Sequence, residues 1–86
     1  MKNSRKQIDE IDDQIIQLLA KRQKIILEIA KYKKENNIDI LDRGREEQIL
    51  TKIAQLAKKE GLDPESINPI FEIMFEWSRN IQDEIN

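Results

Sequence analysis

Histidine and cysteine are both missing from this sequence of 86 residues. Without cysteine, the chain has no disulfide, no thiolate nucleophile and no zinc-thiolate site. Without histidine, it lacks the commonest general base and the commonest metal ligand. These two absences argue against most hydrolytic and metal-dependent reactions, and we expect neither a metal ion nor a cofactor.

Long apolar runs and a basic excess are missing as well. No stretch is long enough to span a membrane or to act as a secretory signal, so we expect a soluble, cytoplasmic protein with no membrane partner. The net charge of -2 gives no case for nucleic acid, because binding to phosphates needs excess positive charge on one face. A chain of this length is one small domain, taken here as residues 1–86.

One long amphipathic helix, over about residues 4–34, dominates the pattern. Its apolar residues recur in alternating steps of three and four, which is typical of a helix packed against other helices. We call them the α-helical seam: Ile8, Ile11, Ile15, Leu18, Ile25, Ile29 and Tyr32. Arg22 interrupts the seam, and Lys33 lies about 20° round the helix and roughly 16 Å further along. Two cations therefore point inward, and a buried guanidinium needs an anionic partner.

The length of this helix predicts an oligomer. About 30 helical residues extend roughly 45 Å, whereas a compact monomer of similar size has a radius of gyration near 13 Å. Two shorter helices of the same chain cannot cover the whole seam. We therefore expect an obligate homodimer in which the long helices lie across or along each other.

The ends of the long helix carry local signals. Residues 1–3 are expected to form a short tail, and Ser4 with Gln7 matches a capping box that opens the helix. The run Glu-Asn-Asn at residues 35–37 is expected to mark its end.

Two shorter helices are expected to follow. Asp42 is a suitable N-cap for the second helix, and Gly61 is its expected stop. Asp63 and Pro64 open the third helix, and Pro69 predicts a kink or a 3₁₀ start about one turn later. The apolar face of the second helix contains Ile49, Leu50, Ile53, Leu56 and Ala57, and that of the third contains Ile67, Phe71, Met74, Ile81 and Ile85. The fold class is therefore all-α, with three helices per chain.

Polar residues interrupt these apolar faces: Arg22 and Lys33 in the first helix, Glu46 in the second, and Ser78 and Gln82 in the third. Each has a simple structural explanation. Arg22 could pair with a core carboxylate, Lys33 could extend to solvent, and Ser78 could bond the carbonyl four residues back. A single ion pair, however, needs no second cation, amide and hydroxyl converging on it. Together these residues predict a polar binding site.

The spacing of the polar residues resembles that of the all-helical, type II chorismate mutases. The matching pattern is Arg5, Arg22, Lys33, Asp42-x-x-Arg45-Glu46 and Ser78-x-x-x-Gln82. It covers the chain from about residue 5 to residue 85 without a gap. The resemblance implies an intertwined helical homodimer with two equivalent sites, each completed by one residue of the partner chain. It also implies the rearrangement of chorismate to prephenate in aromatic amino-acid biosynthesis, a pericyclic reaction that moves no proton and therefore suits a chain without His or Cys.

The resemblance also implies roles for individual residues toward this dicarboxylate substrate. Arg5 and Arg22 would bind the two carboxylates, with Ser78 assisting Arg22. Lys33 would reach a carboxylate and the ether oxygen. Gln82 would donate a hydrogen bond to the same ether oxygen as negative charge develops there.

The second helix would recognise the substrate hydroxyl. By the same resemblance, Glu46 would accept a hydrogen bond from it, helped by the backbone near Asp42, and Arg45 would order Glu46 or contact a carboxylate through water. Two residues depart from the family pattern. Gly44 lies inside the start of the second helix and Pro69 interrupts the third, so both affect local helix stability more than the site.

Three alternatives stay open at this point. One is isochorismate-pyruvate lyase activity, which occurs on the same fold with a similar cationic pocket. Another is a regulatory domain that binds a pathway product or associates with another enzyme of the shikimate pathway. The third is a helical association module in which the polar residues only fix the register of the helices.

Overall fold

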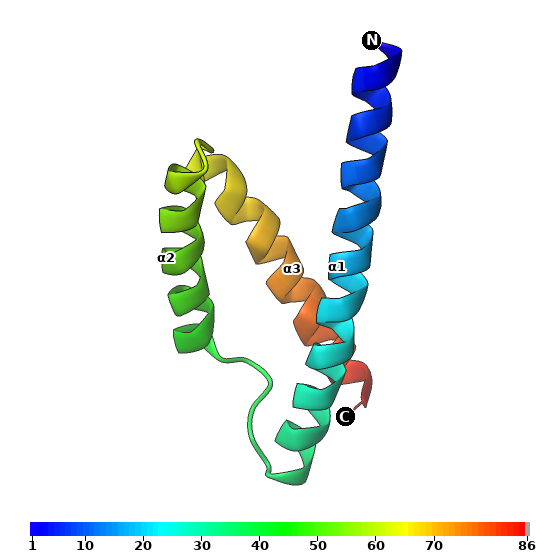
Figure 1. The fold of residues 1–86 in the computed structure, drawn as a ribbon. Helices are drawn as coiled ribbons and strands as arrows, with labels where there is room; N and C mark the ends of the chain where they lie inside the picture. The colour runs from blue at the N-terminus through cyan, green and yellow to red at the C-terminus, as the bar shows by residue number, and fades with distance from the viewer. Residues whose placement is uncertain (86) are drawn as a thin grey trace.

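The computed structural model describes residues 1–85 and contains three α-helices, which confirms the predicted all-helical class. They are α1 (Lys2–Glu35), α2 (Arg43–Lys59) and α3 (Pro64–Ile85), and the described residues form no β-strand. None of these helices is both long enough and apolar enough to cross a membrane. Short connections at residues 36–42 and 60–63 join the helices (Figure 1).

The predicted start of α1 is wrong. The helix already begins at Lys2, with Met1 as an N-cap that makes no side-chain hydrogen bond. The N–H of Arg5 donates to the carbonyl of Met1 at 3.0 Å, so Ser4 lies within the first turn and forms no capping box. The capping preference of serine is worth only about 1 kcal/mol, and neither proline nor glycine precedes it to stop the helix from extending.

The predicted stops of α1 and α2 are confirmed, and both have the same geometry. Asn37 and Gly61 adopt positive φ angles of 54° and 77°. After α1, Ile38 N–H donates to the carbonyl of Lys33 at 2.8 Å, and after α2, Leu62 N–H donates to that of Ala57 at 2.7 Å. These are Schellman motifs, which satisfy carbonyls that the helix end leaves unpaired.

Acidic caps begin α2 and α3 as predicted. The Asp42 carboxylate accepts a hydrogen bond from the Arg45 N–H at 3.0 Å, and that of Asp63 accepts one from the Glu65 N–H at 3.0 Å. Of the kink or 3₁₀ start expected at Pro69, the 3₁₀ start is absent, because α3 is α-helical from Pro64 to Ile85. Pro69 has no N–H, so the carbonyl of Glu65 loses its backbone hydrogen bond. Glu65 is exposed, and water can therefore donate to this carbonyl instead.

The helices form an open, elongated arrangement. Figure 1 shows α3 crossing between α1 and α2, while the N-terminal half of α1 extends away from both. The principal extents are 52 × 24 × 15 Å, and the radius of gyration is 15.6 Å. A compact chain of this length would have about 12 Å. The long helix therefore protrudes, as its length requires.

The small core lies where α3 meets the other two helices. Ala30, Ala57 and Phe75 are its buried apolar residues, and Ser78 and Gln82 are buried beside them. The predicted apolar face of α3 is buried or half-buried throughout, from Ile67 to Ile85. The predicted face of α2 is covered as well, except for Leu56, which is exposed.

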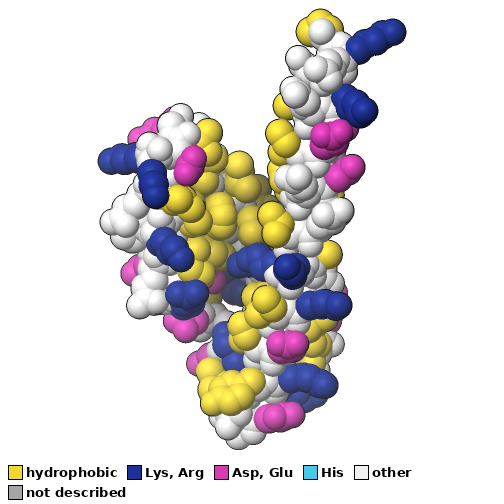
Figure 2. Space-filling view, viewed as in Figure 1, with side chains coloured by type: hydrophobic (Ala, Val, Ile, Leu, Met, Phe, Trp, Pro, Cys, Tyr) yellow, Lys and Arg dark blue, Asp and Glu magenta, His cyan; other side chains and the backbone are white. Residues whose placement is uncertain are grey.

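The α-helical seam of α1 stays uncovered in the single chain. Its seven residues are between 40% and 63% exposed. The residues that α3 covers lie on a face about 100° round the helix: Leu19, Gln23, Ile26, Leu27 and Ala30. Arg22 and Lys33 project between the two faces. Figure 2 shows hydrophobic side chains along the free part of α1 and in the hollow between α1 and α2.

Candidate active site

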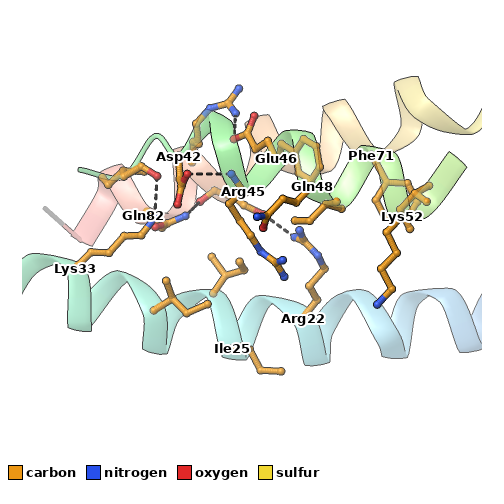
Figure 3. A pocket seen from close by; sticks show the side chains of 18 of the residues that line it. Arg22, Ile25, Lys33, Asp42, Arg45, Glu46, Gln48, Lys52, Phe71 and Gln82 are labelled. Carbon is orange, nitrogen blue, oxygen red and sulfur yellow. Dashed lines mark hydrogen bonds and ion pairs between the residues drawn. The ribbon is translucent and has the colours of Figure 1, made fainter. Parts of the chain in front are cut away.

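A pocket of about 630 Å³ opens between α1 and α2, with α3 as its floor. Seven of the eight predicted site residues line it: Arg22, Lys33, Asp42, Arg45, Glu46, Ser78 and Gln82. Its apolar walls include Ile25 and Ile29 of α1, Ile49 of α2 and Phe75 of α3. Figure 3 shows Arg22 and Lys33 rising from α1 toward residues of α2 and α3. The volume suits a small ligand, since such pockets span about 300–1,000 Å³.

Arg22 is held by Ser78. Its Nη1 donates to the Ser78 Oγ at 2.7 Å, and that hydroxyl donates to the carbonyl of Met74 at 2.8 Å. The serine therefore bonds its own helix, as the simple explanation proposed, and also assists Arg22. Among residues 1–85, no carboxylate forms an ion pair with Arg22. Burial lowers the pKa of the guanidinium, which nevertheless stays charged at any working pH.

Lys33 does not extend freely into solvent. Its Nζ donates to the carbonyl of Ile40 at 2.9 Å, in the connection between α1 and α2. An ammonium group has three donors, so this bond leaves two for a ligand. The contact holds the charge at the end of the pocket where α2 begins.

Gln82 has spare hydrogen-bonding capacity in a dry position. The residue is only 5% exposed, and its Nε2 donates to the carbonyl of Ser78 at 3.2 Å. Its Oε1 is buried without a partner among the described groups. A buried polar atom left unpaired costs stability, so the arrangement is typical of a functional site. The second N–H of the amide can still donate into the pocket.

Arg79 is a pocket residue that sequence reasoning missed. Its Nη1 donates to the Glu46 Oε2 at 2.5 Å, and this is the ion pair found among residues 1–85. We expected Arg45 to order Glu46 or to contact a substrate carboxylate through water, and among residues 1–85 no ion pair joins Arg45 to Glu46. Arg45 instead donates its backbone N–H to Asp42, and its side chain extends across the pocket toward α1 (Figure 3). Arg79 lies about 100° round α3 from Ser78, so the spacing of the inward face gave no signal for it.

Two further polar residues of α2 line the pocket, Gln48 and Lys52. With Arg45 they are spaced at i, i+3 and i+7, which places all three on one helix face. Sequence reasoning missed both residues, although this spacing was visible in the sequence and could have identified them. Lys52 points from α2 toward α1 beside Phe71 (Figure 3).

Arg5 is the predicted site residue that does not reach the pocket of its own chain. It lies in the first turn of α1, 17 residues before Arg22 and therefore roughly 25 Å away along the helix axis. The exposed part of α1 separates the two residues (Figure 1).

The charge of the pocket favours an anion. Five cationic side chains line it, against two carboxylates, which belong to Asp42 and Glu46. The cations are Arg22, Lys33, Arg45, Lys52 and Arg79. No group of three or more acidic, His or Cys side chains in residues 1–85 could hold a metal ion. The pocket can thus fix a small, multiply charged anion between apolar walls.

Comparisons with known proteins agree with this chemistry. A family model described as chorismate mutase type II matches residues 4–83. The chain is 36% identical over 78 residues to the chorismate mutase of Methanocaldococcus jannaschii, covering 91% of this chain and 79% of that protein. It is 43% identical over 74 residues to the bifunctional chorismate mutase/prephenate dehydratase of Buchnera aphidicola subsp. Schizaphis graminum, and 30% identical over 74 residues to that of Escherichia coli K12.

The bifunctional relatives are much longer. The matched region covers 86% of this chain but only 19% of either of these two proteins. No solved structure matches the chain.

Proposed function

The chain belongs to the type II chorismate mutase family, and we propose on this basis that it converts chorismate to prephenate. The observation that supports the proposal best is the convergence of seven family positions on one cationic pocket, from three helices and the connection between α1 and α2. The proposed reaction breaks a carbon–oxygen bond while a carbon–carbon bond forms, with no proton transfer. The protein therefore needs only to hold a reactive conformer and to stabilise developing charge.

Substrate binding in this proposal rests on the cations. Arg22, fixed by Ser78, presents its remaining N–H donors to one carboxylate in a forked, charge-assisted interaction. Lys33 reaches a carboxylate and the ether oxygen of the substrate with the two N–H donors that its bond to Ile40 leaves free. Because Arg22 has no carboxylate partner among residues 1–85, the substrate supplies the anion that its charge lacks.

Transition-state stabilisation in this proposal falls to Lys33 and Gln82. Negative charge builds on the ether oxygen as the carbon–oxygen bond breaks, and donors aimed at that oxygen lower the barrier. Gln82 supplies a neutral, buried donor and Lys33 a charged one. Glu46 accepts a hydrogen bond from the ring hydroxyl and fixes the orientation of the ring.

A homodimer completes the proposal. The seam exposes seven large apolar residues along one face of α1. Such a contiguous apolar patch marks an interaction surface, whereas single scattered apolar residues do not. A second copy with the same seam can cover it in a two-fold arrangement. In such a dimer Arg5 of one chain can approach the pocket of the other, where it would bind the second carboxylate. The single domain of residues 1–86 and its cytoplasmic location stay predictions of the sequence.

Association with a further pathway enzyme is also part of the proposal. The bifunctional relatives combine chorismate mutase with prephenate dehydratase in their names. An enzyme that consumes prephenate is therefore the class of partner we propose.

The decisive experiment is the loss of chorismate absorbance on adding the purified protein, with the product identified by chromatography. A mutase yields one isomer and no pyruvate. Pyruvate released from isochorismate, without turnover of chorismate, would identify the lyase instead. A protein that turns over neither substrate, but is stabilised against heat by a pathway product, would be the regulatory domain.

A further inference from the structure

Arg79 and Ser78 are adjacent on α3 but serve different helices. Consecutive residues of a helix project about 100° apart. Ser78 bonds Arg22 of α1, and Arg79 bonds Glu46 of α2. One turn of α3 thus fixes a cation on one wall of the pocket and a carboxylate on the opposite wall.

The bond geometry leaves Glu46 available to a ligand. An ionised carboxylate accepts hydrogen bonds at both oxygens, and Arg79 contacts Oε2. Oε1 therefore remains to accept from a substrate hydroxyl. The side chains of Glu46 and Arg79 are 25% and 32% exposed, so water reaches the pair and the ion pair adds little to the stability of the fold. A partly exposed glutamate with several rotatable bonds needs such a partner to keep one orientation.

Resting on the proposed function, we infer that Arg79 is a positioning residue for Glu46 and sets recognition of the ring hydroxyl. Arg79 lines the pocket but already has a carboxylate partner, whereas Arg22 has none among residues 1–85. The unpaired Arg22 is accordingly the cation for a substrate carboxylate. Arg79 acts on the substrate only through Glu46, by holding Oε1 toward the hydroxyl.

A double-mutant cycle tests this role. The variants are Arg79→Met, which keeps length without charge, Arg79→Lys, Glu46→Gln and the double variant Arg79→Met/Glu46→Gln. Each is assayed with chorismate and with a chorismate analogue that lacks the ring hydroxyl. Arg43→Met is the matched control, because Arg43 is an exposed arginine of α2 outside the pocket.

The expected result is a loss in kcat/KM that depends on both Glu46 and the hydroxyl. With chorismate, Arg79→Met should lower kcat/KM about tenfold to a hundredfold, the range for losing a hydrogen bond to a charged group. Arg79→Lys should recover part of the loss. In the Glu46→Gln background, and with the analogue, removing Arg79 should cost little more. Melting temperatures should stay within a few degrees of the parent's, and Arg43→Met should behave as the parent.

Two outcomes would overturn the inference while leaving the proposed function intact. Additive losses in the double variant would show that Arg79 acts independently of Glu46. An equal loss with the analogue, carried by KM, would show that Arg79 binds a substrate carboxylate directly. A parent protein with no activity on chorismate would instead refute the proposed function, and this role with it.

Discussion

Subunit mixing tests whether two chains build each site. Arg5 and Arg22 lie on the same continuous helix, roughly 25 Å apart along its axis, so one small dicarboxylate cannot contact both residues of one chain. If both bind substrate, they come from different chains. Arg5→Ala and Arg22→Ala should then each be nearly inactive as homodimers.

Mixing the two variants should restore activity of a defined size. Random exchange of equal amounts makes about half of the dimers heterodimeric. In a heterodimer one site has lost both arginines and the other has lost neither. About a quarter of all sites should therefore regain the parent's activity, measured as chorismate consumption after subunit exchange has been verified by mass spectrometry with an isotope-labelled variant.

A second mixture provides the control. Arg22 and Lys33 line the same pocket of one chain, so mixing Arg22→Ala with Lys33→Ala leaves one lesion in each heterodimeric site. That mixture should recover nothing. Recovery in the control, or its absence in the Arg5 mixture despite verified exchange, would refute the shared site and leave Arg5 as an ordinary solvated residue.

Three further predictions follow from the pocket and the seam. Because Gln82 donates without titrating, the rate of the parent enzyme should be nearly independent of pH between about 5 and 9. Gln82→Glu should lose about a hundredfold or more of the rate at neutral pH and regain activity in acid, where the protonated carboxyl becomes a donor. A Gln82→Glu enzyme with the parent's activity at neutral pH would contradict this role. Burial lowers the pKa of Arg22, so keeping the guanidinium charged in the folded protein lowers the free energy of unfolding at every pH below that pKa. Arg22→Ala should abolish turnover. Its melting temperature should match or exceed the parent's, by the same margin at pH 5 and at pH 9. A large loss of stability would instead make Arg22 a structural residue. Ile15→Glu puts one charge from each chain into the proposed interface, so this variant should be an inactive monomer by sedimentation. Lys24→Glu, on the opposite face of α1, should stay dimeric. An active Ile15→Glu dimer would exclude the seam as the interface.

Local signals predicted the helices because their causes are local. A positive φ angle at Asn37 and Gly61 and the carboxylate caps at Asp42 and Asp63 each act within a few residues. The capping box at Ser4 was wrong because a single cap competes weakly with continuation of the helix.

The site could be predicted only as a set of residues. Spacing placed Arg22, Lys33, Ser78 and Gln82 on inward faces, and the structure brings them to one pocket. Their partners could not be derived in the same way. The pairing of Glu46 with Arg79, 33 residues away, depends on how α3 crosses α2.

The sequence by itself determined the number of helices, most of their ends and the long seam of α1, because side-chain period and capping are properties of one segment. Only the tertiary structure decided which face of α1 is covered by its own chain. The period marks an apolar face but not the element that packs on it, and α3 covers Ile26 and Ala30 while Ile25 and Ile29 stay exposed. Because Arg22 projects between these two faces, the packing of α3 places its charge in the pocket rather than in a closed core.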